Sequence, residues 1–303
     1  MKITFLGLGV MGYPMAGHLR TAGHDVCVYN RTTSKAQKWV DEFDGNYGET
    51  PAIAAKNSDL VLVCVGNDDD VREMIIGDKG VLNGLKEGSI IVDHTTTSDR
   101  LAKEMYRVVQ EKSGHFIDAP VSGGQAGAES AQLAIMAGGD KTIFDKVASV
   151  LNVYAKSLLY MGAAGAGQAT KMTNQLLIAG ILQGISEGFA LAKSAGLDLD
   201  TVAQAISAGS AGSWQLSNRA ENIINDKFDY GFAVDWMRKD LGFCLQAAKD
   251  YGIELPNAQW VDNCYATLQA EGHQRSDTSV LVKQYANINQ GKPRKMKTAP
   301  FSK

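Results

Sequence analysis

Three glycines close to the N-terminus restrict the fold more than any other feature of this sequence. The apolar stretch KITFLG (2–7) has the length of a short strand, and Gly7-x-Gly9-x-x-Gly12 overlaps its end. Residues 11–23 then carry apolar side chains at helical spacing. A G-x-G-x-x-G pattern alone is weak evidence, but between a strand and a helix it is typical of dinucleotide binding.

Each glycine has a physical task in such a turn. The first permits a tight turn, the second lets the backbone approach a pyrophosphate, and the third allows the helix to pack closely on the strand. The N-terminus of the helix then faces the negative charge. We therefore predict a cofactor-binding turn formed by Gly7, Leu8, Gly9, Val10, Met11 and Gly12.

The remainder of the first half alternates strands with helices. Apolar, strand-like runs occupy 25–30, 59–65 and 89–95, and helical patterns occupy 35–43 and 99–112. Such alternation predicts a mainly parallel, doubly wound sheet with helices on both faces, that is, a Rossmann-type α/β domain. Ligands of these sheets bind outside the carboxyl ends of the strands.

The end of the second strand favours NADP(H) over NAD(H). A carboxylate there would bind the ribose 2′-hydroxyl of NAD, but this chain has Asn30, Arg31 and Thr32. An arginine supplies a planar fork of donors that suits a phosphate. The alternative is that Arg31 is a solvated loop residue and Asn30 a turn former.

A second cluster of small residues spans 116–139. Ser122, Gly123 and Gly124 could present a hydroxyl and two backbone amides to a carboxylate. A purely structural turn would also use Gly and Ser, so the residues alone favour neither interpretation.

The second half is predicted to be all-helical and to begin with one long helix of roughly thirty residues that ends at Gly196. Lys171, Asn174 and Gln175 share one face of it, which is either solvated surface or a polar site. Further helical segments separated by breakers follow. The expected organisation is a dinucleotide-binding domain (1–163), a long interdomain helix (164–195), an all-helical domain (196–288) and a loosely ordered basic tail (289–303).

Composition excludes several classes of protein. The chain has 303 residues, a net charge of -3 and a sequence pI near 6.0, so no basic field points to nucleic acid. The four cysteines form no C-x-x-C pair, and the histidines and carboxylates show no metal-ligand spacing. We find neither a signal peptide nor an uninterrupted apolar run long enough for a bilayer, so we expect a cytoplasmic protein without a membrane partner.

Taken together, four stretches resemble the β-hydroxyacid dehydrogenases, a family that includes 3-hydroxyisobutyrate dehydrogenase, tartronate semialdehyde reductase and the glyoxylate/succinic semialdehyde reductases. They are GLGVMGYPMAGHL, DAPVSGGQAGAESAQLAIMAGGD, GAGQATKMTNQ and RKDLGFCLQAAKDYG, in order over nearly the whole chain. The resemblance implies that Lys171 is catalytic. It implies a substrate site formed by Ser122, Gly123, Gly124, Asn174 and Gln175, and further cofactor contacts from Val65, Gly66, Thr96 and Lys239.

Three positions depart from the pattern of the family. Gln175 stands where many members have asparagine, Gly66 where a bulkier residue is frequent, and His94 where methionine is frequent. The change at Gln175 keeps an amide donor and acceptor but shifts them by one methylene.

The resemblance implies an NADP(H)-dependent oxidoreductase that acts on a small semialdehyde or hydroxy acid and assembles as a homodimer or homotetramer. Reduction of an aldehyde develops an alkoxide, and a lysine ammonium can stabilise that charge and deliver the proton. We expect the polar face of the long helix to be the catalytic wall of a cleft between the two domains. The alternatives are an NADP-dependent imine reductase, whose relatives generally lack the lysine, and a non-catalytic dinucleotide-binding module.

Overall fold

The computed structural model describes residues 1–285. Residues 286–303, which include the expected basic tail at 289–303, lie outside the described part of the chain. Two compact units make up the chain, the first comprising Met1–Thr173 and the second beginning at Asn174.

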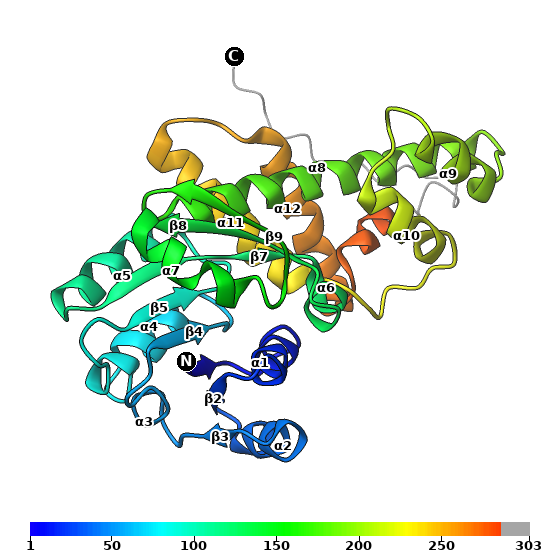
Figure 1. The fold of residues 1–303 in the computed structure, drawn as a ribbon. Coiled ribbons are helices and arrows are strands. Elements are labelled where there is room, and N and C mark those ends of the chain that lie inside the picture. The colour runs from blue at the N-terminus through cyan, green and yellow to red at the C-terminus, as the bar shows by residue number, and fades with distance from the viewer. Residues whose placement is uncertain (286–303) are drawn as a thin grey trace. The chain divides into compact units, whose positions relative to one another are not determined.

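A nine-stranded sheet forms the centre of the first unit (Figure 1). Its order is β3-β2-β1-β4-β5-β6-β8-β7, with β9 paired to β8. The strands are β1 (Lys2–Leu6), β2 (Asp25–Tyr29), β3 (Asn46–Tyr47), β4 (Leu60–Val63), β5 (Ile90–Asp93), β6 (His115–Asp118), β7 (Val121–Ser122), β8 (Leu133–Gly139) and β9 (Ala155–Gly162).

Parallel pairing runs unbroken from β3 to β6, and only β8 pairs antiparallel, with β6 and β7. The chain progresses from β1 to β2 in one direction and from β4 to β5 in the other. This reversal between β1 and β4 is the switch point beside which open α/β sheets bind their ligands. The predicted doubly wound, mainly parallel sheet is confirmed.

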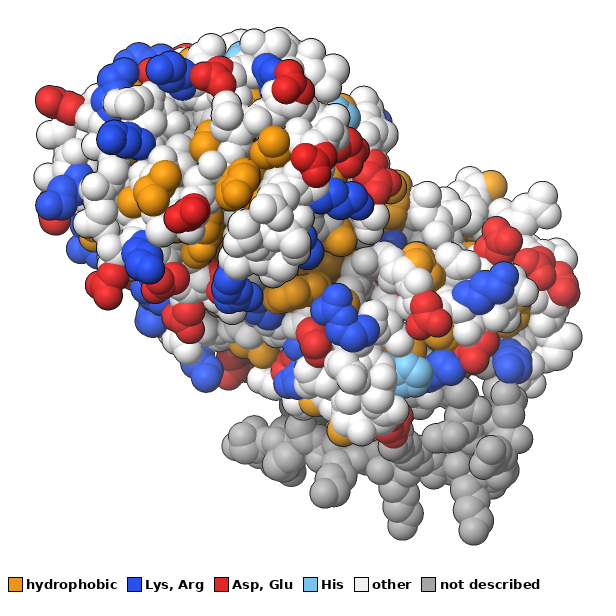
Figure 2. Space-filling model, turned by 90° about the horizontal axis from the view of Figure 1, so that it is seen from below, with side chains coloured by type: hydrophobic (Ala, Val, Ile, Leu, Met, Phe, Trp, Pro, Cys, Tyr) orange, Lys and Arg blue, Asp and Glu red, His pale blue; other side chains and the backbone are white. Residues whose placement is uncertain are grey.

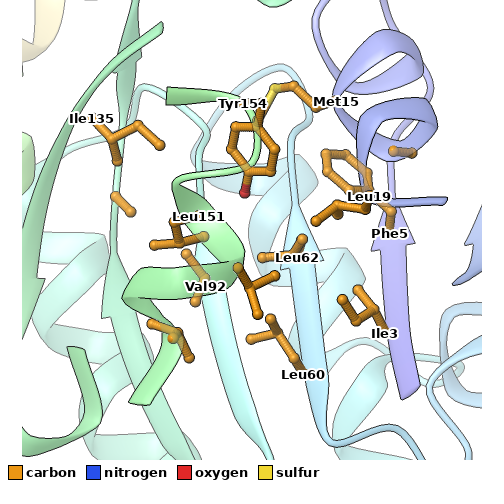
Figure 3. Close-up of a cluster of buried hydrophobic side chains, with 14 of the residues drawn as sticks. Ile3, Phe5, Met15, Leu19, Leu60, Leu62, Val92, Ile135, Leu151 and Tyr154 are labelled. Atoms are coloured by element: carbon orange, nitrogen blue, oxygen red, sulfur yellow. The ribbon is translucent and has the colours of Figure 1, made fainter. Parts of the chain in front are cut away.

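Helices cover both faces of this sheet, because successive side chains of a buried strand point to opposite sides. Ile3 and Leu60 belong to one buried cluster, whereas Leu6 and Val61 belong to another. Figure 3 shows side chains of the first cluster, which come from β1, β4 and β5 and from the helices above them: Ile3, Phe5, Met15, Leu19, Leu60, Leu62, Val92 and Leu151. The helices of this unit are α1 (Gly12–Thr21), α2 (Thr33–Phe43), α3 (Pro51–Ala54), α4 (Asp68–Ile76), α5 (Asp99–Glu111), α6 (Gly124–Glu129) and α7 (Lys141–Leu151), with a 3-10 turn η1 (Val81–Asn83).

The long helix α8 (Ala166–Ser194) begins in the first unit and continues into the second. The second unit is otherwise helical: α9 (Leu199–Ser207), α10 (Trp214–Ile224), α11 (Val234–Tyr251), α12 (Pro256–Leu268), a π-helical turn η2 (Gln269–His273) and a 3-10 helix η3 (Thr278–Gln284). Its core is formed by buried apolar side chains from one face of each longer helix, for example Phe189, Leu216, Leu241 and Tyr265. The predicted all-helical second half is confirmed for the described residues.

Helix α8 bears on the expectation about membranes. By length and composition it is long and apolar enough to cross a bilayer, and it is the one such helix among residues 1–285. A helix buried in a protein core can have the same length and composition, and Ala179, Leu182 and Phe189 of α8 are buried in the core of the second unit. Lys171 and Glu187 interrupt the apolar residues of α8, so this finding does not contradict the expectation that no uninterrupted apolar run is long enough to cross a bilayer.

The described surface mixes charges of both signs. Figure 2 shows acidic and basic side chains interspersed over the visible face, with apolar side chains in small groups between them. This distribution agrees with the small net charge of the sequence. The four cysteines are free thiols, of which Cys244 and Cys264 are buried and Cys27 and Cys64 are half-buried.

Candidate active site

The parallel strands end in register at one edge of the sheet. Tyr29 pairs with Leu6, Leu6 with Val63, Val63 with Asp93, and Asp93 with Asp118. The residues that follow these strands therefore lie along a single edge. Each of these segments contributes predicted site residues, for example Gly7, Asn30, Val65, Thr96 and Ser122.

The geometry of the glycine turn matches the tasks expected of Gly7 and Gly12. Gly7 has a φ of +96°, and a Cβ there would lie 2.2 Å from the carbonyl oxygen of Cys64. A Cβ on Gly12 would lie 2.0 Å from the carbonyl oxygen of Gly7, so any side chain would force helix and strand apart. A Cβ on Gly9 would meet nothing within 4 Å. The backbone at Gly9 thus faces open space, which fits a turn that a pyrophosphate approaches.

The side chain of Asn30 stabilises this turn through two hydrogen bonds. Its Oδ1 accepts the Leu8 backbone N–H at 2.9 Å, and its Nδ2 donates to the Thr32 carbonyl at 3.1 Å. Arg31, the next residue, is exposed over 86% of its side chain, and its guanidinium lies 3.6 Å from a carboxylate oxygen of Asp70. The turn-former interpretation of Asn30 is therefore confirmed, and the predicted contact of Arg31 with the cofactor stays a prediction.

The segment after β5 is bonded to the segment after β4. The Val65 N–H donates to Thr95 Oγ1 at 3.0 Å, and Thr95 N–H donates to Asp93 Oδ1 at 2.9 Å. Thr96 is half-buried between the buried Thr95 and Thr97. Burial raises the pKa of Asp93 to about 7. Gly66 is also half-buried beside this segment.

His94, which departs from the pattern of the family, has a structural role. Its Nδ1 lies 2.7 Å from the Ala119 carbonyl oxygen, and its Nε2 lies 2.8 Å from the Tyr154 hydroxyl. A carbonyl can only accept, so Nδ1 carries the hydrogen and Nε2 accepts from the hydroxyl. Burial lowers the pKa of His94 to about 4. The neutral ring therefore ties β5 to the chain entering β9.

The second glycine cluster forms a turn that needs glycine. Gly123 has a φ of +138° and Gly124 a φ of +62°, conformations that residues with a Cβ rarely adopt. Ser122, directly before them, is half-buried at the end of β7, and both glycines are exposed. The structural demand for glycine is thus clear, and the substrate-binding role of these three residues stays a prediction.

Lys171 is nearly buried, with 7% of its surface exposed. It lies on the second turn of α8, whose start is held by the buried carboxylate of Asp118. Gly165 N–H donates to Asp118 Oδ1 at 2.8 Å, and Gln168 N–H donates to Oδ2 at 2.9 Å. Burial raises the pKa of Asp118 to about 6, while these backbone donors oppose the rise. The interpretation of this helix face as solvated surface is therefore wrong at Lys171.

The amides one turn later join a network within the second unit. Asn174 Nδ2 donates to Gln175 Oε1 at 2.8 Å, and Gln175 Nε2 donates to Asp240 Oδ2 at 2.6 Å. The Lys239 ammonium lies 3.2 Å from Asp240 Oδ1 and over the rings of Trp236 and Phe243. Gln175 and Asp240 are each exposed over only 2% of their surface.

Asp240 is the site residue that sequence reasoning missed. It links two predicted residues that were assigned to different ligands, Gln175 to the substrate and Lys239 to the cofactor. The available signal was its place in RKDLG, one residue before Leu241 on an amphipathic helix, where a carboxylate next to the buried side needs a partner. No cluster of three potential metal ligands occurs within residues 1–285.

Comparisons with known protein families cover both units. Residues 2–162 match the NAD binding domain of 6-phosphogluconate dehydrogenase. Residues 165–285 match the NAD-binding domain of NADP-dependent 3-hydroxyisobutyrate dehydrogenase. The two matches meet at the start of α8.

Relatives of full length are also found. An uncharacterized oxidoreductase of Shewanella frigidimarina is 50% identical over 93% of this chain and 97% of its own length. The 2-hydroxy-3-oxopropionate reductase of Escherichia coli is 34% identical over 93% of this chain and 96% of its own.

Solved structures agree with these relatives. A structure of 3-hydroxyisobutyrate dehydrogenase from Mycobacterium tuberculosis with L-serine superposes with a TM-score of 0.84, at 30% identity over 93% of this chain and 98% of that one. An imine reductase from Myxococcus stipitatus superposes with a lower TM-score of 0.64 at 19% identity, a likeness that shows the fold alone.

Proposed function

This chain belongs to the β-hydroxyacid dehydrogenase family, and from that membership we propose that it transfers hydride between NADP(H) and a small aldehyde acid or hydroxy acid, with Lys171 as the proton donor and acceptor. Because the chain belongs to this family, the protein is an oxidoreductase of the NAD(P)-dependent hydroxyacid dehydrogenase type. The preference for NADP(H), the substrate and the role of each residue belong to the proposal.

The burial of Lys171 carries this proposal. Lysine is among the residues least often buried, because its ammonium must be desolvated. Here it is 7% exposed on a helix whose first turn is bonded to the ends of β5 and β6. When aldehyde is reduced, negative charge develops on the carbonyl oxygen, and an ammonium held in place stabilises that charge and donates the proton. In the oxidative direction the neutral amine accepts the hydroxyl proton.

The glycine turn and the end of β2 support the binding of NADP(H). The bound dinucleotide would supply the hydride at its nicotinamide. Gly9 leaves room for the pyrophosphate, and Arg31 provides a cation where a 2′-phosphate is expected. We assign Val65, Gly66, Thr96 and Lys239 to further contacts with the cofactor on the resemblance of the sequence.

The substrate we propose carries a carboxylate. Ser122 with the amides of Gly123 and Gly124 would hold that carboxylate, and Asn174 with Gln175 would orient the reacting end. The Escherichia coli relative that reduces 2-hydroxy-3-oxopropionate supports an aldehyde acid of this size. Gln175 also supports it, because this chain resembles the tartronate semialdehyde reductases in carrying asparagine followed by glutamine at positions 174 and 175.

The test is an assay of cofactor oxidation with a panel of aldehyde acids. Glyoxylate, succinic semialdehyde, tartronate semialdehyde and methylmalonate semialdehyde are each offered with NADPH and with NADH. We expect turnover with NADPH on at least one of them, and we expect Lys171→Ala to abolish it while cofactor binding, followed by fluorescence, is retained. Tight binding of NADPH without turnover of any aldehyde, together with reduction of a cyclic imine, would replace the proposal by the imine reductase alternative.

A further inference from the structure

Gln168 stands between Lys171 and the segment that contains Thr96. It is fully buried on the first turn of α8, three residues before Lys171. Its Nε2 donates to the Thr95 carbonyl at 2.7 Å, and its Oε1 accepts the Thr97 N–H at 3.0 Å. One carboxamide therefore holds the backbone on both sides of Thr96.

The backbone of Gln168 is itself fixed. Its N–H donates to Asp118 at the end of β6, and a Cβ on the preceding Gly167 would lie 2.4 Å from the Met136 carbonyl oxygen and 2.6 Å from that of Asp118. Helix α8 thus starts in close contact with β6 and β8. The helix can neither slide nor turn without breaking these contacts, so the side chain of Gln168 has a defined origin.

The chemistry of the clamp requires glutamine. The bonded groups are a backbone acceptor on one side of Thr96 and a backbone donor on the other, and the carboxamide of glutamine offers a donor and an acceptor at one end without needing to be protonated. Glutamate has the same length, but its ionised form cannot donate to the Thr95 carbonyl. Asparagine has both groups but is one methylene shorter. A buried backbone group that loses its partner is costly, so the segment would shift to find another.

We propose that Gln168 is a positioning residue for hydride transfer, because it places the Thr96 segment and Lys171 in one rigid frame. This inference rests on the proposed function, in which Thr96 contacts the cofactor and Lys171 the reacting oxygen. Misplacement of reacting groups by about 1 Å can cost roughly 100-fold in rate, so loss of the clamp acts on turnover more than on binding.

Gln168→Glu tests the clamp through its pH dependence. At alkaline pH the introduced carboxylate repels the Thr95 carbonyl, and we expect kcat to fall roughly 10- to 100-fold. Burial raises the pKa of a carboxyl, and its protonated form donates and accepts as the amide does. Turnover should therefore recover as the pH falls. Asp93, His94, Asp118 and Lys171 are ionisable groups close to this segment in both proteins, so the quantity to follow is the ratio of the variant's kcat to that of the wild type at each pH.

A matched control lies on the same helix. Gln183 is also a buried glutamine of α8, bonded to Glu187 and Tyr285 in the second unit. Gln183→Glu makes the same chemical change four turns later, and we expect its kcat to stay within about two-fold of wild type without the pH-dependent recovery. Gln168→Asn is the milder variant in case Gln168→Glu does not fold, and it should lower kcat with little change in KM. Circular dichroism confirms that each protein compared is folded.

The outcomes separate this inference from the proposed function. Suppose that the wild type turns over aldehyde and that both folded Gln168 variants have the same kcat as the Gln183 control. This result overturns the inference and leaves the proposed function standing. A wild type that binds NADPH but reduces no aldehyde removes both. A larger primary isotope effect with deuterated NADPH in Gln168→Asn than in wild type is the expected sign that hydride transfer itself has slowed.

Discussion

At the scale of the residue, the buried pair of His94 and Tyr154 makes the unfolding free energy of the protein depend on pH in the acidic range. The pKa of His94 is lowered from 6.5 to about 4 by burial, so the unfolded chain takes up a proton before the folded chain does. The stability contributed by the neutral ring is fully present above pH 6.5 and is lost as the pH falls toward 4. Its size is about 3 kcal/mol of unfolding free energy.

We predict that His94→Met removes this dependence, since methionine does not titrate. Asp93 and Asp118 act in the opposite sense, because their raised pKa values favour folding as the pH falls. Both are present in wild type and variant, so the difference between the two urea unfolding curves isolates His94. As the pH falls from 7 to 4, the unfolding free energy of the variant should rise by about 3 kcal/mol relative to that of wild type. A difference that stays constant across this range would show that the ring is not buried neutral.

Arg31 carries the second prediction at this scale. Arg31→Ala should weaken NADPH binding by roughly 10- to 100-fold, the value of a charge-assisted hydrogen bond, and leave NADH binding nearly unchanged. Fluorescence titration with both cofactors measures the two constants. Lys35→Ala, an exposed cation on the helix that follows, is the matched control. Equal losses for both cofactors would contradict a contact with the 2′-phosphate.

The sequence could indicate which residue types stand at the strand ends, but not how they are bonded. Gly7 and Gly12 were predictable because their tasks in the turn exclude a side chain. Asp240 was not, since its bond to Gln175 joins residues 65 positions apart and nothing in local spacing encodes that contact.

At the scale of the element, the ion pair of Arg219 and Asp277 joins α10 to the start of η3. Arg219 donates to both carboxylate oxygens, at 2.9 and 3.0 Å, and Asp277 also accepts the N–H groups of Phe232 and Ser279. Arg219→Met would leave a fully buried carboxylate without its cation. We predict a loss of about 3 to 5 kcal/mol in unfolding free energy.

The control for this loss is an exposed pair. Lys141 and Asp145 lie 2.6 Å apart on α7 with more than half of each side chain exposed. Lys141→Met should change the unfolding free energy by about 0.5 kcal/mol or less. Denaturant titrations of the two variants compare the pairs directly. Similar losses of unfolding free energy would mean that the burial of Asp277 does not increase the cost of removing its cation.

Helices and strands were predicted where the apolar residues have a strong periodicity. They were missed where the pairing of distant strands determines the structure. The helix at 99–112 and the strand at 25–30 follow from local patterns, and the structure places α5 and β2 there. No prediction covers α7 or β9, nor the antiparallel insertion of β8 beside β6. The partner of a strand depends on contacts distant in sequence, so the order of this edge of the sheet could not be derived from residue patterns.

At the scale of the whole molecule, helix α8 presents an apolar face to solvent. Leu177, Ile181 and Leu191 are exposed over 62%, 36% and 73% of their surface. Gly184 and Gly188 lie on the same face, and a Cβ on either would meet nothing within 4 Å. The spacing of four and three residues is that of a helix face that packs against another helix. This face contributes to the length and apolar composition by which α8 could cross a bilayer.

We propose that a second copy of the chain covers this face, as the resemblance to the family implied. The double substitution Leu177→Glu and Leu191→Glu would bury two carboxylates in such a contact, and we expect it to raise the dissociation constant by roughly 100-fold or more. Sedimentation velocity should then show a dimer or tetramer for wild type and a smaller species for the variant. Ile53→Glu, at an exposed apolar residue of the first unit, should leave the assembly intact. A wild type that sediments as a monomer at micromolar concentration would contradict the proposal, because the exposed face of α8 would then be stable in water without a partner.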